Sequence, residues 1–126
     1  VVNVVVPELK QPEIRVEKIN ISYPGEIDTP IKEYICGKWG AFDCRVAIAV
    51  AQSESGLRED AIHINTNNTI DYGIFQVNSV HFSKPGCSMK DLVDQYKNVD
   101  CAFKIYKASG WDAWVGFNNG NFKNHL

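Results

Sequence analysis

The run Val46-Ala-Ile-Ala-Val-Ala51 is the feature that most narrows what this chain can fold into. It is apolar on every side, so as a helix it has no face that suits water and belongs at the centre of a domain. Asp43 is suited to cap the start of this helix, and Gly56 is suited to end it. The chain is therefore expected to be built around one buried central helix.

Length and composition limit the number and class of domains that can form around that helix. The chain has 126 residues, 44% of them hydrophobic and 22% charged, which is typical of one compact domain. The formal net charge is −2 and no basic block is present, which argues against nucleic acid as a partner. No run of about 18 apolar residues exists that could span a membrane. We expect a monomer.

The four cysteines, at positions 36, 44, 87 and 101, lack the CxxC spacing of a zinc ribbon. Their even number predicts two disulfides and an oxidising, extracytoplasmic compartment. The favoured pairing is Cys36–Cys44 with Cys87–Cys101, in which each bond closes a short loop and stabilises the fold by about 2–3 kcal/mol. Four buried free thiols are the alternative.

Residues 1–29 differ in composition from the rest, with Pro7, Pro12 and Pro24 and no cysteine. We interpret them as an extended N-terminal arm or linker, and residues 30–126 as the domain. Because the sequence starts without Met, a processed or trimmed N-terminus is also expected.

Helix signals recur through residues 30–126. Thr29 and Pro30 suit the start of a first helix, which Gly37 and Gly40 are expected to break. Ser88 and Asp91 form a capping-box pattern that predicts another helix.

The remaining signals complete a mostly α (α+β) fold. Asn98 is expected to cap a helix that Gly110 ends, and Asp112 to cap a last short helix through Trp114. Apolar residues flank the polar turn at 65–69, which is typical of a β-hairpin. The sequence therefore predicts a helical domain with one small hairpin.

Glu54 stands near the C-terminal end of the central helix. The partial negative charge of a helix C-terminus disfavours a carboxylate there, and burial disfavours it as well. Both effects are expected to raise the pKa of Glu54 and to keep it protonated at neutral pH, as a general acid requires. A capping or solvated glutamate is the alternative.

Asp71 falls on the second strand of the expected hairpin, where the chain has turned back. A helix-end carboxyl group facing a strand carboxylate is how glycosidases hold two acids across a sugar bond. One acid protonates the leaving oxygen, and the other stabilises the oxocarbenium ion, attacks it or directs water.

Three motifs in order resemble the lysozyme superfamily: Glu54-Ser55-Gly56, Asp71-Tyr-Gly-Ile-Phe-Gln-Val-Asn-Ser79, and Gly110-Trp-Asp-Ala-Trp-Val115. Both animal-type lysozymes and bacterial lytic transglycosylases of the SLT type show similar motifs. The resemblance covers roughly residues 31–120. It implies cleavage of the β-1,4 bond between N-acetylmuramic acid and N-acetylglucosamine in peptidoglycan strands, or of chitooligosaccharides, without a cofactor.

By this resemblance, Glu54 is the general acid and Asp71 the second carboxylate. Eight further residues are expected to bind sugar or support the site: Ser55, Gln76, Asn78, His81, Phe82, Tyr106, Trp114 and Asn118. The alternatives are that Gln76 bonds only the hairpin backbone and that Trp114 is plain core. Phe117 departs from the transglycosylase pattern, which usually has tyrosine there; Tyr106 and Tyr72 are the candidate replacements.

The resemblance leaves two products open. Hydrolysis gives a reducing sugar, whereas attack by the muramic 6-hydroxyl on C1, with water excluded, gives a 1,6-anhydro ring. The low cysteine count and the short stretch between Ser79 and Cys101 favour the transglycosylase, while Asp71 and Phe117 favour the hydrolase. We prefer the transglycosylase; a non-catalytic peptidoglycan-binding module is a third possibility.

No metal site is expected. Asp91, Asp94 and Asp100 lack the spacing of a calcium-binding loop. His81 has no second histidine or carboxylate nearby in the sequence, and a metal role is not assigned to His63 or His125.

Overall fold

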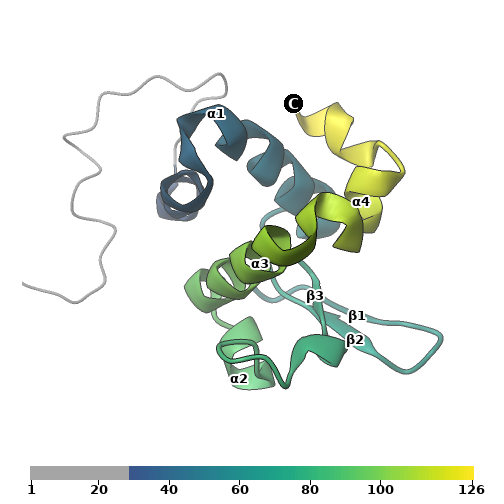
Figure 1. The fold of residues 1–126 in the computed structure, drawn as a ribbon. Coiled ribbons are helices and arrows are strands. Elements are labelled where there is room, and N and C mark those ends of the chain that lie inside the picture. The colour runs from purple at the N-terminus through teal and green to yellow at the C-terminus, as the bar shows by residue number, and fades with distance from the viewer. Residues whose placement is uncertain (1–28) are drawn as a thin grey trace, which may run out of the picture.

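The computed structural model describes residues 29–126 (Figure 1). Its helices are α1 (Pro30–Ser55), α2 (Met89–Leu92), α3 (Gln95–Ser109) and α4 (Val115–Asn118). Its strands are β1 (Ile62–Ile64), β2 (Ile70–Tyr72) and β3 (Val77–Asn78), and its 3-10 helices are η4 (Ser79–His81), η5 (Gly110–Ala113) and η6 (Asn121–His125). The expected mostly helical fold with a small sheet is confirmed. The expected arm lies outside the described residues, apart from Thr29.

α1 has 26 residues and is bent at Gly40, whose φ of 87° and ψ of 158° are not helical. Its start is as predicted, because the Thr29 side chain accepts a hydrogen bond from the Lys32 N–H at 3.3 Å and Pro30 is the first helical residue. Gly56 ends the helix in the left-handed conformation, with φ 67°.

Two expectations for α1 were wrong. Gly37 lies inside the helix, because glycine is only a weak breaker where the rest of the segment packs well. Asp43 is not an N-cap, because the helix resumes directly after Gly40 and Asp43 already lies within it.

The segment of α1 after the bend forms the centre of the core, as its composition predicts. Ala47, Ala49, Val50 and Ala51 have no exposed surface. An aromatic cluster continues the core from Trp39, whose ring stacks on Phe75 at 5.4 Å and on Trp111 at 5.5 Å between centroids.

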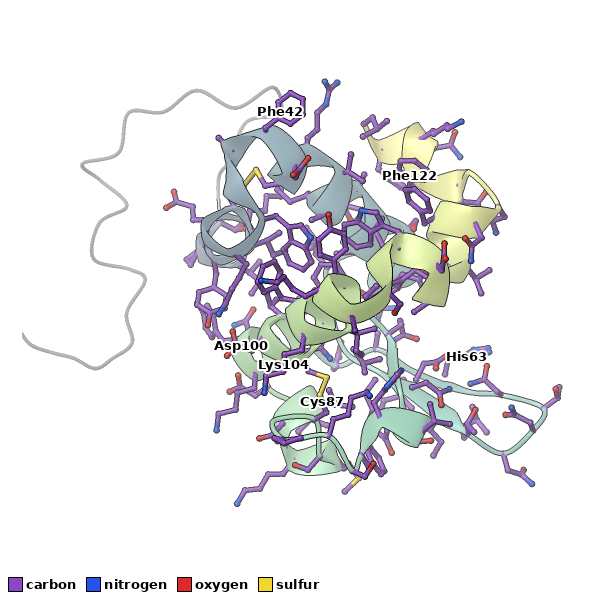
Figure 2. All side chains as sticks on the ribbon, in the orientation of Figure 1. Phe42, His63, Cys87, Asp100, Lys104 and Phe122 are labelled. Carbon is purple, nitrogen blue, oxygen red and sulfur yellow. A yellow bond between two sulfur atoms is a disulfide. The ribbon has the colours of Figure 1, made fainter. Side chains whose placement is uncertain are left out.

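Two disulfides join Cys36 to Cys44 and Cys87 to Cys101, with Cα–Cα distances of 4.7 and 5.4 Å. The predicted pairing is therefore confirmed. The first bond spans the bend in α1, and the second ties the segment before α2 to α3, where Figure 2 labels Cys87.

The sheet is antiparallel, in the order β1-β2-β3. The predicted hairpin is β1 and β2; β3, with only two residues, was not predicted. Asp71 pairs with His63 on one side and with Asn78 on the other.

α3 begins at Gln95 because the side chain of Asp94 accepts hydrogen bonds from the Tyr96 and Lys97 N–H groups, both at 2.9 Å. The expected cap at Asn98 was therefore wrong, since Asn98 lies one turn inside the helix. Gly110 ends α3 as predicted.

Of the two other expected helix caps, one is present and one is not. The capping box of Ser88 and Asp91 is present at α2. Asp112 lies within η5 and does not cap a helix through Trp114; the next helix, α4, begins after Trp114. Across residues 29–126, no helix combines the length and apolar character that a membrane span needs.

Asn98 instead fastens the sheet to α3. Its side chain is fully buried and accepts a hydrogen bond from the Phe75 N–H at 2.9 Å. Its amide donates to the carbonyls of Tyr72 at 2.8 Å and Leu92 at 2.9 Å. A Cβ at Gly73 would lie 2.7 Å from the Leu92 carbonyl oxygen, so this close approach requires glycine. These contacts hold the β2–β3 turn in place next to Asp71.

Candidate active site

A cleft of ≈520 Å³ lies between the end of α1, the sheet and the segment before α4. Both expected acids, Glu54 and Asp71, line it. The other lining residues include polar groups from the sheet, its turn and η4, and apolar groups from several elements. They are Asn65, Thr66, Asn67, Thr69, Gln76, Val77, Asn78, Val80, His81, Ile105, Ala113, Trp114 and Val115.

Glu54 enters the cleft from the last turn of α1. Burial raises the pKa of Glu54 above the usual glutamate range; the hydrogen bond from Gly116 lowers it, and the negative charge of Asp71 raises it further. The net direction is upward, so the side chain holds its proton to higher pH than an exposed glutamate. This is the property that a general acid needs.

Gly116 fixes the Glu54 carboxyl group. Its backbone N–H donates to Glu54 Oε2 at 2.9 Å. A Cβ at position 116 would lie 2.9 Å from the same oxygen and would collide with Ser53 Oγ. Position 116 therefore needs glycine to let the backbone come this close. Sequence reasoning missed it, although it follows directly after the Trp114-Val115 motif.

Asp71 is held by two side-chain amides. Asn78 Nδ2 donates to Oδ1 at 2.8 Å, and Asn65 Nδ2 donates to Oδ2 at 3.2 Å. Asn78 is itself oriented, because its Oδ1 accepts the Val80 N–H at 2.9 Å. Both oxygens of Asp71 therefore accept hydrogen bonds from side-chain amides. The site thus presents one acid disposed to stay protonated and one held as an acceptor.

Residues of the hairpin turn complete this network and were not predicted. Thr69 Oγ1 accepts from Asn78 Nδ2 at 2.9 Å and from Asn65 Nδ2 at 3.2 Å. The Thr69 hydroxyl donates to Asn67 Oδ1 at 2.6 Å. The polar turn between the strands was the available signal, and it indicated only a hairpin.

Gln76 and Trp114 each combine a structural contact with a place in the cleft. Gln76 Nε2 donates to the carbonyls of Ala61 at 3.1 Å and Gly73 at 3.0 Å, so it does bond the hairpin backbone. Trp114 is only 3% exposed and its Nε1 donates to the Phe75 carbonyl at 2.8 Å. Both residues nevertheless line the cleft, as the resemblance implied.

His81 lies in the cleft, while Phe82 lies beside it. Burial, and then the positive charge of Lys84, hold the pKa of His81 below its usual value, which favours the neutral imidazole. Phe82 is 38% exposed and packs on Tyr72 with ring centroids 5.8 Å apart. Phe82 is not among the residues that line the cleft.

Three other expected residues have structural contacts away from the lining. Ser55 Oγ donates to the Ile74 carbonyl at 2.7 Å, which joins α1 to the β2–β3 turn. Tyr106 packs in the aromatic cluster, 4.6 Å from the Trp111 ring. Asn118 is exposed and its amide donates to the Asp112 carbonyl at 2.9 Å.

In the part of the chain that the structure describes, no three His, Cys, Asp or Glu side chains gather in a way that could hold a metal ion.

Comparisons with known proteins show which family the chain is similar to. A family model described as a lysozyme-like domain matches residues 37–116. Lysozyme c-1 of Anopheles gambiae is 32% identical over 81 residues, which cover 57% of this chain and 58% of the relative. Lysozyme P of Drosophila melanogaster is 37% identical over 78 residues, which cover 52% of this chain and 55% of the relative. The chain thus spans less than two thirds of the length of these relatives.

The fold is also similar to that of a solved protein. The crystal structure of a lysozyme from Litopenaeus vannamei matches with a TM-score of 0.59 at 23% identity. The match covers 75% of this chain and 86% of that one. At this identity, the likeness supports the fold.

Proposed function

Because this chain belongs to the lysozyme-like domain family, we propose that it hydrolyses the β-1,4 bond between N-acetylmuramic acid and N-acetylglucosamine in peptidoglycan. Chitooligosaccharides, which contain the same type of bond, are the second substrate class. The observation that carries the proposal is the raised pKa of Glu54 in a cleft that it shares with the amide-held Asp71.

Each acid has a distinct role in the proposed reaction. Glu54 donates its proton to the glycosidic oxygen as the bond to C1 breaks, and the leaving sugar departs as an alcohol. Positive charge develops on the ring and C1, and the Asp71 carboxylate faces it. Water then adds to C1, and the ionised Glu54 takes up the proton, which returns the enzyme to its starting state.

Hydrolysis now ranks above the transglycosylation that the sequence analysis preferred. The relatives named above are lysozymes, which favours the hydrolytic alternative. The cleft offers further support: neither Tyr72 nor Tyr106, the candidate replacements for the transglycosylase tyrosine, belongs to its lining. Phe117, at the tyrosine position, stacks on Phe122 at 4.7 Å within the core.

The proposed setting is extracytoplasmic, where peptidoglycan is found. The two disulfides support an oxidising compartment. We propose that the domain acts on the glycan as a monomer.

The test is mass spectrometry of soluble muropeptides released from purified peptidoglycan by wild type and by Glu54→Gln. Glu33→Gln is the matched control, because Glu33 lies in the first turn of α1, at the opposite end from Glu54. Wild type and Glu33→Gln are expected to release products with reducing ends, and Glu54→Gln none.

Two outcomes would overturn the proposal. Products one water lighter than reducing muropeptides would identify a lytic transglycosylase. Wild type that binds peptidoglycan and releases nothing would identify a non-catalytic binding module.

A further inference from the structure

A second pocket lies on the other side of α3 from the cleft. Its volume is ≈460 Å³, and the residues that line it, which we call the lysine pocket, are Lys38, Gly86, Asp91, Lys97, Asp100, Phe103 and Lys104. Within residues 29–126, its lining and that of the cleft share no residue. On α3, Phe103 lines the pocket and Ile105 lines the cleft. Residues two apart on a helix point about 200° apart, so the two hollows lie on different sides of α3.

The two acids of the lysine pocket already have partners within the chain. Asp91 Oδ2 accepts the Ser88 N–H at 3.1 Å and the Ser88 hydroxyl at 2.9 Å. Asp100 Oδ1 accepts the Tyr34 hydroxyl at 2.6 Å and lies 3.0 Å from Lys38 Nζ. Three ammonium groups against two carboxylates leave a surplus of one positive charge in the lining. The pocket therefore suits a ligand with a single negative charge.

Two of the three lysines are held in place by the fold. Lys104 Nζ donates to the Pro85 carbonyl at 2.8 Å, and a Cβ at Gly86 would lie 3.2 Å from the same nitrogen, so glycine leaves room for the ammonium group. Lys38, besides its ion pair, lies over the Tyr34 ring, with Nζ 5.4 Å from the centroid. An ammonium group has three N–H donors, so both lysines keep donors for a ligand.

The lysine pocket also has an apolar wall. Phe103 is half-buried, and its ring packs edge-to-face on Trp39 with centroids 4.9 Å apart, which fixes its position. Lys97 is exposed on the same helix, and Figure 2 labels Asp100 and Lys104 together there. The ligand that fits this lining carries an anionic group next to a small apolar group.

We propose that the lysine pocket binds the D-alanine carboxylate ends of the peptides that peptidoglycan carries. Each such end combines one negative charge with a methyl group, which match the surplus positive charge and the Phe103 wall. The inference rests on the proposed function, since it takes peptidoglycan as the substrate. A polymer held at the cleft and at this pocket is bound at two points, and the second contact raises the affinity through effective concentration. Chitooligosaccharides lack these peptides and use the cleft alone.

The experiment measures sedimentation with purified sacculi freed of teichoic acid, in a Glu54→Gln background so that the glycan is not cut. Adding Lys97→Gln together with Lys104→Gln is expected to raise Kd by about 3- to 10-fold, as for the loss of two exposed ion pairs. The matched control is Arg45→Gln with Lys123→Gln, which removes the same charge from exposed positions outside the pocket. This control is expected to change Kd by less than about 2-fold, because surface charges away from the contact are screened by salt.

Two further ligands test the chemistry of the pocket. Diacetyl-L-lysyl-D-alanyl-D-alanine is expected to compete with the sacculi and to abolish the difference between the lysine double variant and its parent. The C-terminal amide of this peptide, which lacks the carboxylate, is expected not to compete. Chitohexaose is expected to bind both proteins equally, which shows that the cleft is intact.

Three results would overturn the inference. The first is an equal loss of sacculus binding in the control pair, which would mean that only overall charge matters. The second is competition by the amide as well as by the free peptide. The third is competition by inorganic phosphate but not by the peptide, which would assign the pocket to a phosphate group.

Failure of the inference can be told from failure of the proposed function. If wild type releases no product but Glu54→Gln still binds sacculi, the proposed function fails while the effect of the two lysine substitutions remains measurable. If wild type is active and the lysine double variant binds sacculi as its parent does, the inference alone is wrong. If Glu54→Gln does not bind sacculi, the inference is overturned as well.

Discussion

The backbone N–H of Gly116 donates to Glu54 Oε2 at 2.9 Å and joins the start of α4 to the end of α1. This bond favours the ionised carboxylate, so it lowers the pKa of the group that it positions. Burial, the largest effect, and the charge of Asp71 act in the opposite direction. Glu54 is thus held in place by a contact that opposes its protonation, and burial outweighs that contact.

The raised pKa of Glu54 predicts the alkaline limit of activity. The proposed reaction needs protonated Glu54, so kcat/KM is expected to fall as the pH rises through the pKa of this group in the free enzyme. The midpoint of that limb should lie above 4.5, the ordinary glutamate value. A pH profile on a soluble chitooligosaccharide measures it. A limb at or below the ordinary value would contradict the assignment of Glu54 as the acid.

The same shift predicts how stability depends on pH. Since folding raises the pKa of Glu54, the folded state favours its protonated form. The resulting stability is complete below the unfolded pKa and is lost as the pH rises through the folded pKa. Glutamine stays neutral at every pH. We therefore expect the melting temperature of Glu54→Gln minus that of wild type to be larger at pH 8 than at pH 4. Thermal melts of Glu33→Gln, with the same difference from wild type at both pH values, provide the control.

Gly116→Ala is expected to displace the Glu54 carboxyl group, because the added Cβ would collide with Ser53 Oγ and crowd Glu54 Oε2. A shift of about 1 Å in a reacting group can lower turnover by about 100-fold. We expect kcat to fall at least 10-fold (about 1.4 kcal/mol in barrier). Steady-state kinetics on the folded variant check this.

Gly37→Ala is the matched control for that substitution. Gly37 lies inside α1, and none of the described atoms comes within 4 Å of a Cβ built there. We expect unchanged kinetics and a gain of about 0.5–1 kcal/mol in stability, because alanine is the better helix former. Equal kinetic losses in both variants would show that the effect at position 116 is not specific to Glu54.

Asn98→Ala is expected to destabilise the fold severely. It removes the bond to the Phe75 N–H and leaves the carbonyls of Tyr72 and Leu92 without the donor that satisfied them in the core. Unsatisfied buried groups cost about 1–3 kcal/mol each, so we expect a loss of about 3 kcal/mol or more. Urea unfolding measures it. Asn118→Ala, which removes one exposed hydrogen bond, should cost less than about 1 kcal/mol.

Features that depend on local chemistry could be predicted from the sequence. The start of α1 at Pro30, its end at Gly56 and the box of Ser88 and Asp91 each follow from contacts within a few residues. Asn98 could not be placed, because asparagine suits a helix cap and a buried hydrogen-bonding position equally well. Asp94, one turn earlier, caps α3, and the Asn98 side chain instead bonds the β2–β3 turn.

In the candidate site too, some residues could be predicted from the sequence and others depend on contacts made only in the folded molecule. The resemblance predicted Glu54, Asp71, Gln76, Asn78 and Trp114 from motifs of fixed spacing, and His81 from its place just after the second motif; all six line the cleft. It could not exclude Ser55, whose hydroxyl turns away to the Ile74 carbonyl, because side-chain direction depends on packing. Asn65 and Gly116 were missed because their partners, Asp71 and Glu54, meet them only in the folded molecule.

The bend at Gly40 connects a distant part of the molecule to the cleft. The Cys36–Cys44 bond clamps the chain on both sides of this bend, so the bend resists straightening. Trp39, next to the bend, stacks on Phe75, and the Phe75 carbonyl receives the indole N–H of Trp114 in the lining of the cleft. Reducing this disulfide is therefore expected to loosen the wall of the cleft at Trp114, although neither Cys36 nor Cys44 lines the cleft.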